Sequence, residues 1–103
     1  MIVQIASRSD SVTDDERRYA WRLSERFGRY FAAIGEVKWT LSAERQLRTA
    51  SCNLYGKSGF YHAEAGRRTF RESINLVFRK IVEQRKRRKS IARQRAVKAG
   101  RAE

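Results

Sequence analysis

A run of five consecutive cations is the feature of this sequence with the clearest chemistry. Residues 85–89 read Arg-Lys-Arg-Arg-Lys, and the stretch from residue 85 to residue 103 holds nine Lys or Arg against one Glu. This stretch therefore carries +8 of the formal net charge of +13. Cations at this density suit a partner with regularly spaced negative charge, because each neutralised phosphate releases condensed counterions. The sequence thus predicts nucleic acid as the partner.

Few residues of the chain could perform acid–base, nucleophilic or metal chemistry. His62 is the single histidine and Cys52 the single cysteine, which excludes a His/Cys metal cluster and an intrachain disulfide. His62 has no neighbouring nucleophile or carboxylate pair, so we interpret it as a structural histidine hydrogen-bonded across a sheet. Cys52 alternates with apolar residues, as a buried inert thiol does. We expect no catalytic residue, metal, cofactor, small-molecule substrate or enzyme activity.

Hydrophobic periodicity predicts the order of the elements. Period-two alternation indicates strands near residues 3–6, 37–42, 50–55 and 60–65. Apolar residues at helical spacing predict two helices, the first capped by Thr13 with Glu16 and the second capped by Thr69. The apolar faces of these helices are Ala20, Leu23, Phe27 and Phe31 in the first, and Phe70, Ile74, Val77, Phe78 and Ile81 in the second. Residues 43–46 and 56–59 are the expected turns.

These elements predict an α+β fold, a two-layer sandwich in the order β-α-β-β-β-α with both helices on one face of a four-stranded sheet. The first two strands are expected to pair in parallel, and strands two to four to form an antiparallel meander. We expect residues 1–89 to form the folded domain and residues 90–103 a basic, flexible tail. The opposite sheet face should be solvated, with Lys38, Thr40, Ser51 and Asn53 on it.

The aromatic residues divide into two groups. Trp39 and Phe60 are assigned to the core. Tyr30, Tyr55 and Tyr61 could each stack on a nucleobase, and the sequence does not select one of them.

The order of elements, the Thr13 cap, residues 59–65 and residues 74–84 together resemble the ribosome hibernation-promoting factors. This family includes the ribosome-associated inhibitors and was once labelled the sigma-54 modulation protein family. The resemblance extends from Met1 to about Lys89. Its most specific parts are the His-Ala-x-Ala strand at residues 62–65 and the Lys80-Ile81-x-x-Gln84 segment of the second helix.

The resemblance implies a protein that binds the small ribosomal subunit through ribosomal RNA. Such a protein blocks the messenger and transfer RNA sites and inhibits translation in idle, stressed cells. The positions matching the RNA-binding side chains of the family are Lys80, Arg87 and Lys89 on the second helix, with Arg88 in the same run. Arg22 and Arg29 on the first helix are a looser match, supported by their outward-facing spacing.

The sequence departs from the family pattern at three places. Thr69-Phe70-Arg71 replaces the usual Asp-x-Tyr, which keeps a cap and loses the tyrosine. Arg85 stands where relatives often carry leucine, so we expect a shorter buried stripe and a helix that leaves the body about one turn earlier. The long members carry a further C-terminal domain that pairs two ribosomes, whereas this chain resembles a short form and is expected to be monomeric when free.

Other interpretations of these cations and of the function of the protein remain. The run at residues 85–89 could be a solvated helix end, and Arg18, Arg22 and Arg29 an ordinary solvated face. A free double-stranded RNA-binding or RNA-chaperone module could use a similar sandwich, although such domains usually begin with a helix and lack the strand at residues 3–6. An enzyme subunit is disfavoured by the absence of an acid–base or metal constellation. No apolar run approaches a membrane span and no signal peptide is evident, so we expect a cytoplasmic protein without a membrane partner.

Overall fold

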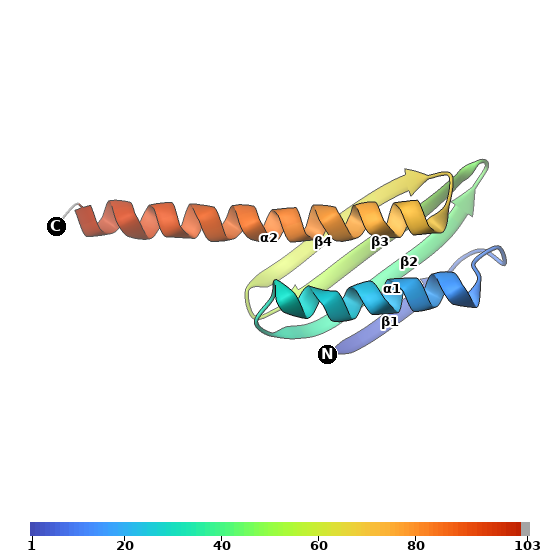
Figure 1. Ribbon diagram of the computed structural model, residues 1–103, viewed down its shortest axis with the longest axis horizontal. Helices are drawn as coiled ribbons and strands as arrows, with labels where there is room; N and C mark the ends of the chain where they lie inside the picture. Colours follow the sequence, from blue (N-terminus) through green and yellow to red (C-terminus); the bar gives the residue numbers. More distant parts are fainter. Residues whose placement is uncertain (102–103) are drawn as a thin grey trace.

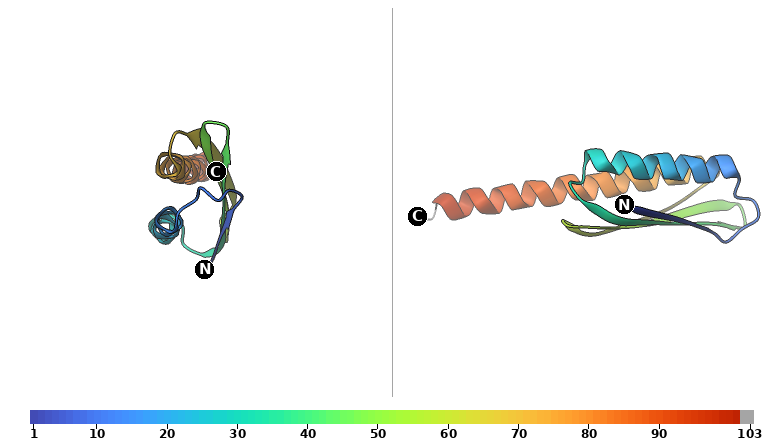
Figure 2. Two further views of the ribbon diagram at one scale, coloured as in Figure 1. Left: turned by 90° about the vertical axis from the view of Figure 1, so that its right-hand side faces the viewer. Right: turned by 90° about the horizontal axis from the view of Figure 1, so that it is seen from below.

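The fold is a four-stranded mixed sheet covered on one face by two helices. The computed structural model describes the backbone of residues 1–101 and the side chains of residues 1–89. The elements are, in chain order, β1 (Ile2–Ser7), α1 (Asp14–Arg26), the 3-10 helix η1 (Phe27–Arg29), β2 (Ile34–Glu44), β3 (Leu47–Gly56), β4 (Gly59–Arg67) and α2 (Phe70–Arg101). The sheet order is β1-β2-β3-β4, with β1 parallel to β2 and the other pairs antiparallel. Both helices lie on the same side of the sheet (Figure 1, Figure 2), which confirms the predicted α+β sandwich.

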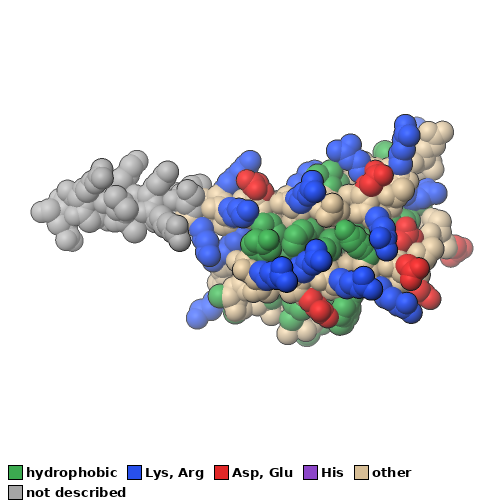
Figure 3. Space-filling view, viewed as in Figure 1, with side chains coloured by type: hydrophobic (Ala, Val, Ile, Leu, Met, Phe, Trp, Pro, Cys, Tyr) green, Lys and Arg blue, Asp and Glu red, His purple; other side chains and the backbone are tan. Residues whose placement is uncertain are grey.

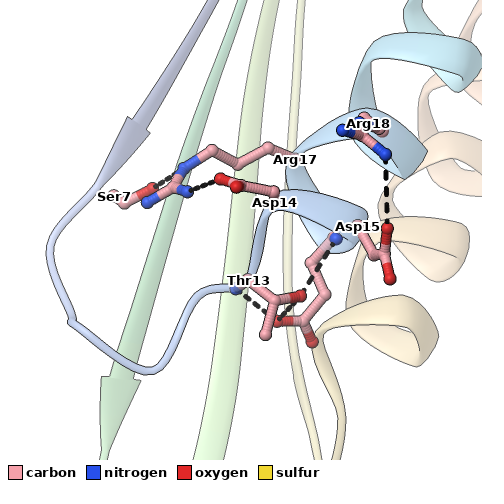
Figure 4. Close-up of polar contacts among 7 residues, drawn as sticks. Ser7, Thr13, Asp14, Asp15, Arg17 and Arg18 are labelled. Carbon is pink, nitrogen blue, oxygen red and sulfur yellow. Dashed lines mark hydrogen bonds and ion pairs between the residues drawn. The ribbon is translucent and has the colours of Figure 1, made fainter.

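Helix α1 begins where the sequence predicts. The backbone N–H of Thr13 donates to Glu16 Oε1 at 2.9 Å, and the N–H of Glu16 donates to Thr13 Oγ1 at 3.2 Å (Figure 4). This reciprocal capping box satisfies two backbone donors that the first turn would otherwise leave without partners. Arg17, in the same turn, donates from Nε to the hydroxyl of Ser7 at 3.0 Å. The contact ties the start of α1 to the end of β1.

The core lies between the helices and the sheet, and the predicted helical faces supply one side of it. Trp39 of β2 is 1% exposed and stacks on Phe27, with 6.5 Å between ring centroids. Its indole N–H donates to Ser24 Oγ at 2.7 Å, and that hydroxyl donates to the carbonyl of Ala20 at 2.9 Å. A buried polar chain therefore links the central strand to α1 without leaving a donor unsatisfied. The core assignment of Trp39 is confirmed.

The assignment of Phe60 to the core was wrong. The register of β4 places Leu54 opposite Tyr61, so Tyr61 points inward with no exposed surface, and Phe60 points to the open face of the sheet with 47% exposed. There Phe60 packs against Tyr55, with 4.9 Å between the rings. Side chains alternate along a strand, so burial of one aromatic exposes its neighbour. Burial also removes Tyr61 from the three tyrosines that could stack on a base.

The two hairpin turns are tighter than the sequence suggests. Strand β2 continues to Glu44, so only Arg45 and Gln46 lie between β2 and β3, and Arg45 adopts a φ of 56°. Lys57 and Ser58 likewise form the turn between β3 and β4. Two-residue loops match the twist of paired strands when a residue takes positive φ. Of the expected four-residue turns, 43–46 loses residues 43 and 44 to β2, and 56–59 loses Gly56 to β3 and Gly59 to β4.

Helix α2 is the longest element, and it continues along its axis past the ends of the strands (Figure 1). The N–H of Glu72 donates to Thr69 Oγ1 at 3.2 Å, which confirms the predicted cap. The helix includes most of the segment 90–103 that the sequence predicts as a flexible tail. The side chains of that segment lie outside the described residues, and its flexibility stays a prediction. Within the described residues, neither helix has the length and apolar character needed to cross a membrane.

The buried polar chain gives a test of the core. Replacing Ser24 with alanine leaves the buried indole N–H of Trp39 without an acceptor, so Ser24→Ala should lower the free energy of unfolding by about 1–3 kcal/mol. Urea denaturation measures this change. In a Trp39→Phe background, which has no indole donor, Ser24→Ala should cost much less. An equal cost in both backgrounds would contradict the interaction.

Candidate nucleic-acid interface

The first cations of α1 are neutralised by the acidic residues of its first turn. Arg17 pairs with Asp14 at 2.8 Å, and Arg18 lies 3.6 Å from Asp15 (Figure 4). Acidic residues at the start of a helix also favour the helix dipole. These two arginines are therefore poor candidates for binding a polyanion.

Three arginines further along the same helical region, unlike Arg17 and Arg18, form no ion pair with the described residues. Arg22, Arg26 and Arg29 line one shallow hollow, and none of them lies within 4 Å of a described carboxylate oxygen. Glu25 borders the hollow, but its carboxylate accepts a hydrogen bond from the indole of Trp21 at 2.9 Å. Arg26 was missed by the sequence analysis, although its spacing of i+4 from Arg22 marks it as a neighbour. Arg29 belongs to η1, and it continues the stripe.

Lys80 makes a hydrogen bond within the folded body, to the backbone of strand β4. Its ammonium donates to the backbone carbonyl of Glu64 at 3.0 Å, and the amide of Gln84 donates to the carbonyl of His62 at 2.6 Å. Strand β4 is the edge of the sheet, so β3 pairs with only one side of it. An exposed row of carbonyl and amide groups on such an edge invites pairing with another chain. Lys80 and Gln84 occupy two of those carbonyls.

The remaining predicted cations of α2 are exposed. Arg87 shares a shallow hollow with Lys80, Glu83 and Gln84, and Lys89 follows it on the helix. Within the described part of the chain, neither Arg87 nor Lys89 forms an ion pair. The structure therefore groups Lys80 and Arg87, whereas the α1 cations line a separate hollow. In Figure 3, Lys and Arg side chains cover both helices, and hydrophobic side chains lie between them.

Arg85 and Arg88 pack on aromatic rings of the body. The guanidinium carbon of Arg88 lies 3.9 Å from the ring centroid of Tyr61, and that of Arg85 lies 6.0 Å from the centroid of Phe31. The apolar stripe of α2 does end at Val82, the last buried residue before Arg85. The helix nevertheless keeps contact with the body through Arg88, about one turn further than the substitution at position 85 suggests.

These two cations also influence the phenol of Tyr61. Burial raises the pKa of Tyr61, but hydrogen bonding with the hydroxyl of Ser58 and with Arg85 and Arg88, together with the charge of Arg85, outweighs burial and sets the pKa below its ordinary value. The phenol oxygen lies 3.4 Å from the hydroxyl of Ser58, in the turn between β3 and β4. Arg85 and Arg88 therefore place two positive charges at the end of the body beside this turn.

The residues considered for catalysis have structural surroundings. His62 Nδ1 lies 2.5 Å from Asn53 Oδ1 on the neighbouring strand, which confirms the predicted contact across the sheet. Cys52 is 1% exposed, and burial raises the pKa of its thiol far above the usual range. Over the residues that the structure describes, no group of three or more His, Cys, Asp or Glu gathers to hold a metal. The described cations Arg22, Arg26, Arg29, Arg87 and Lys89, by contrast, lie on the helices without a described carboxylate within 4 Å.

Comparison with known proteins finds similarity at the level of the fold. No family model and no curated protein matches the chain. A ribosomal subunit interface protein from Coxiella burnetii superposes with a TM-score of 0.75 at 13% identity, covering 87% of this chain and 99% of that protein. The N-terminal domain of Thermus thermophilus Protein Y superposes with a TM-score of 0.75 at 22% identity, covering 84% of this chain and 98% of that domain. The chain shares their fold, which is the fold that the sequence resemblance implies.

The edge contacts of α2 give a second test. Lys80→Ala combined with Gln84→Ala removes both donors to the carbonyls of β4 and should lower the free energy of unfolding by about 1–2 kcal/mol. It should also promote self-association through the uncovered edge. Urea denaturation and sedimentation velocity measure the two effects.

The matched control is Arg79→Ala combined with Glu83→Ala, which changes two exposed residues of the same helix. Its stability and association state should stay close to those of the wild type. Equal behaviour of the two double variants would show that the edge contacts contribute nothing.

Proposed function

We propose that this chain binds the small ribosomal subunit through ribosomal RNA. Bound there, it would block the messenger and transfer RNA sites and inhibit translation in idle cells. The observation that carries the proposal is an α+β body with the fold of the two similar structures, whose helical cations beyond Arg18 have no carboxylate oxygen within 4 Å among the described residues. One of the two similar structures is a ribosomal subunit interface protein, which supports the choice of partner.

The proposed mechanism is steric. Folded RNA is recognised largely by its shape and by the positions of its phosphates, because the major groove of an RNA helix is too deep and narrow for side chains to contact the bases. The sandwich supplies a fixed shape, and the cations supply affinity and fast, salt-dependent association. Because no bond has to be made or broken, the absence of an acid–base constellation among the described residues is compatible with this role.

The proposed RNA contacts are Arg22, Arg29, Lys80, Arg87, Arg88 and Lys89. We add Arg26 to this proposal because it lines the same hollow as Arg22 and Arg29. Lys80 can act in both capacities, since an ammonium group has three donors and the carbonyl of Glu64 uses one. Arg87 and Lys89 have no such structural contact among the described residues. They are therefore the cleaner positions at which to test the surface.

The alternative is a free double-stranded RNA-binding or RNA-chaperone module. Strand β1 lies at the edge of the sheet and pairs in parallel with β2. The usual double-stranded RNA-binding sandwich begins with a helix and lacks this strand, so its presence favours the ribosomal proposal. Competition between small subunits and a duplex RNA of random sequence would separate the two, because only the ribosomal protein should prefer the subunit at equal phosphate concentration.

Charge reversal tests the cationic surface. Arg87→Glu combined with Lys89→Glu should abolish co-sedimentation with small subunits at moderate salt, because two phosphate contacts become repulsive. At low salt, where binding can still be measured, the slope of log affinity against log salt should become shallower by about two.

The control is Lys38→Glu combined with Arg8→Glu, which makes the same change in net charge outside both helices. This variant should still co-sediment, with at most a small loss of affinity. Equal losses in both variants would indicate unspecific attraction, and unchanged binding of the helix variant would contradict the assignment of the surface.

The proposed role in idle cells has its own test. In sucrose gradients of cell extracts, the protein should migrate with small subunits or whole ribosomes after starvation and much less during growth. Migration at the top of the gradient under both conditions would overturn the proposal.

A further inference from the structure

Two arginines of α2 converge on the end of the body beside the turn between β3 and β4. Arg88 lies over the buried ring of Tyr61, and Arg85 lies over Phe31, whose ring contacts Tyr61 edge-on at 4.9 Å between centroids. A Cβ atom added at Gly59 would stand 3.3 Å from a terminal nitrogen of Arg88, so the guanidinium lies directly against the strand. Both side chains are thus held in place by the core.

The local charge of this cluster is not balanced by the described residues. Neither Arg85 nor Arg88 has a carboxylate oxygen within 4 Å among them. The Nε of Arg85 is buried and has no hydrogen-bond acceptor there. Like charges in proximity repel, and a buried donor without an acceptor is destabilising. An anion bound to the outer nitrogens of these side chains would relieve the repulsion between the two charges.

We propose that Arg85, Arg88 and Ser58 form one binding site for a backbone phosphate of RNA. The inference rests on the proposed function and names one contact within it. The planar guanidinium offers paired N–H donors that match two phosphate oxygens. The hydroxyl of Ser58 lies 3.4 Å from the phenol oxygen of Tyr61, and Arg88 lies over the ring of the same residue. Arg85 is half-buried and Arg88 exposed, so the cluster is accessible from solvent.

The anchoring on aromatic rings distinguishes this site from the neighbouring cations. Exposed Arg87 and Lys89 lose side-chain entropy when they bind a phosphate, whereas Arg85 and Arg88 are already held by Tyr61 and Phe31. Preorganisation lowers the cost of binding. The site should therefore add to the affinity for RNA and also fix the place on the RNA at which α2 binds.

A charge-conserving exchange tests the site. Arg85→Lys combined with Arg88→Lys keeps both positive charges but loses the planar guanidinium groups and their paired N–H donors. We expect binding to small subunits to weaken roughly tenfold, since charge-assisted hydrogen bonds are lost. The matched control, Arg71→Lys combined with Arg79→Lys, changes two exposed arginines of the same helix that are not among the proposed RNA contacts, and it should bind within about twofold of the wild type. Sedimentation binding over a salt series measures both.

The outcomes separate the two proposals. If wild-type protein fails to bind small subunits, the proposed function fails. If wild type binds and the Arg85/Arg88 variant binds as well as its control, the phosphate site fails while the function stands. Thermal unfolding of each variant identifies a loss that comes from instability of the fold.

A second measurement needs no substitution. The Nε–H resonances of Arg85 and Arg88 in wild-type protein should shift saturably on addition of a short hairpin of small-subunit ribosomal RNA. Saturable shifts elsewhere on α2 with unmoved Arg85 and Arg88 resonances would overturn the site, even if the variants proved unstable.

Discussion

The structure depends on the match between α2 and the edge strand β4. Lys80 and Gln84 stand four residues apart on the helix, a rise of about 6 Å, and they meet carbonyls two residues apart on the strand, about 6.8 Å. The order is reversed, because Lys80 meets Glu64 and Gln84 meets His62, so the helix runs antiparallel to the strand. This register closes one sheet edge and fixes the line along which the rest of α2 continues.

The same register determines where charge accumulates. Both helices begin at one end of the sheet and run toward the other (Figure 1). The acidic first turn of α1 neutralises Arg17 and Arg18, and Arg22, Arg26 and Arg29 follow toward the opposite end. Because α2 runs the same way, residues 85–89 reach that end as well. The body therefore carries a charge gradient along its length, which orients it in the field of a polyanion.

Most of the fold was predictable because one-sided burial imposes a period on each element. The helical faces and the positions of the strands followed from that period, whereas the caps followed from Thr13, Glu16 and Thr69 and the strand pairing from the order of the elements. Phe60 was misassigned because adjacent aromatics at 60 and 61 fit either phase of a strand, and only the pairing of Tyr61 with Leu54 decides between them. The edge contacts of Lys80 and the ring contacts of Arg88 join residues far apart in sequence. No local pattern contains them.

The two motifs that carry the family resemblance acquire a physical reason from this geometry. The strand motif at residues 62–65 supplies the carbonyls of His62 and Glu64, and the helix motif supplies the donors Lys80 and Gln84. The alanines at positions 63 and 65 point inward beneath α2, where small side chains let the helix approach the sheet. The two contacts set the direction of α2 along β4, and Arg85 stands beyond Val82, the last buried residue of the helix. At position 85 the guanidinium lies over Phe31, so the helix that completes the core also presents a cation beside it.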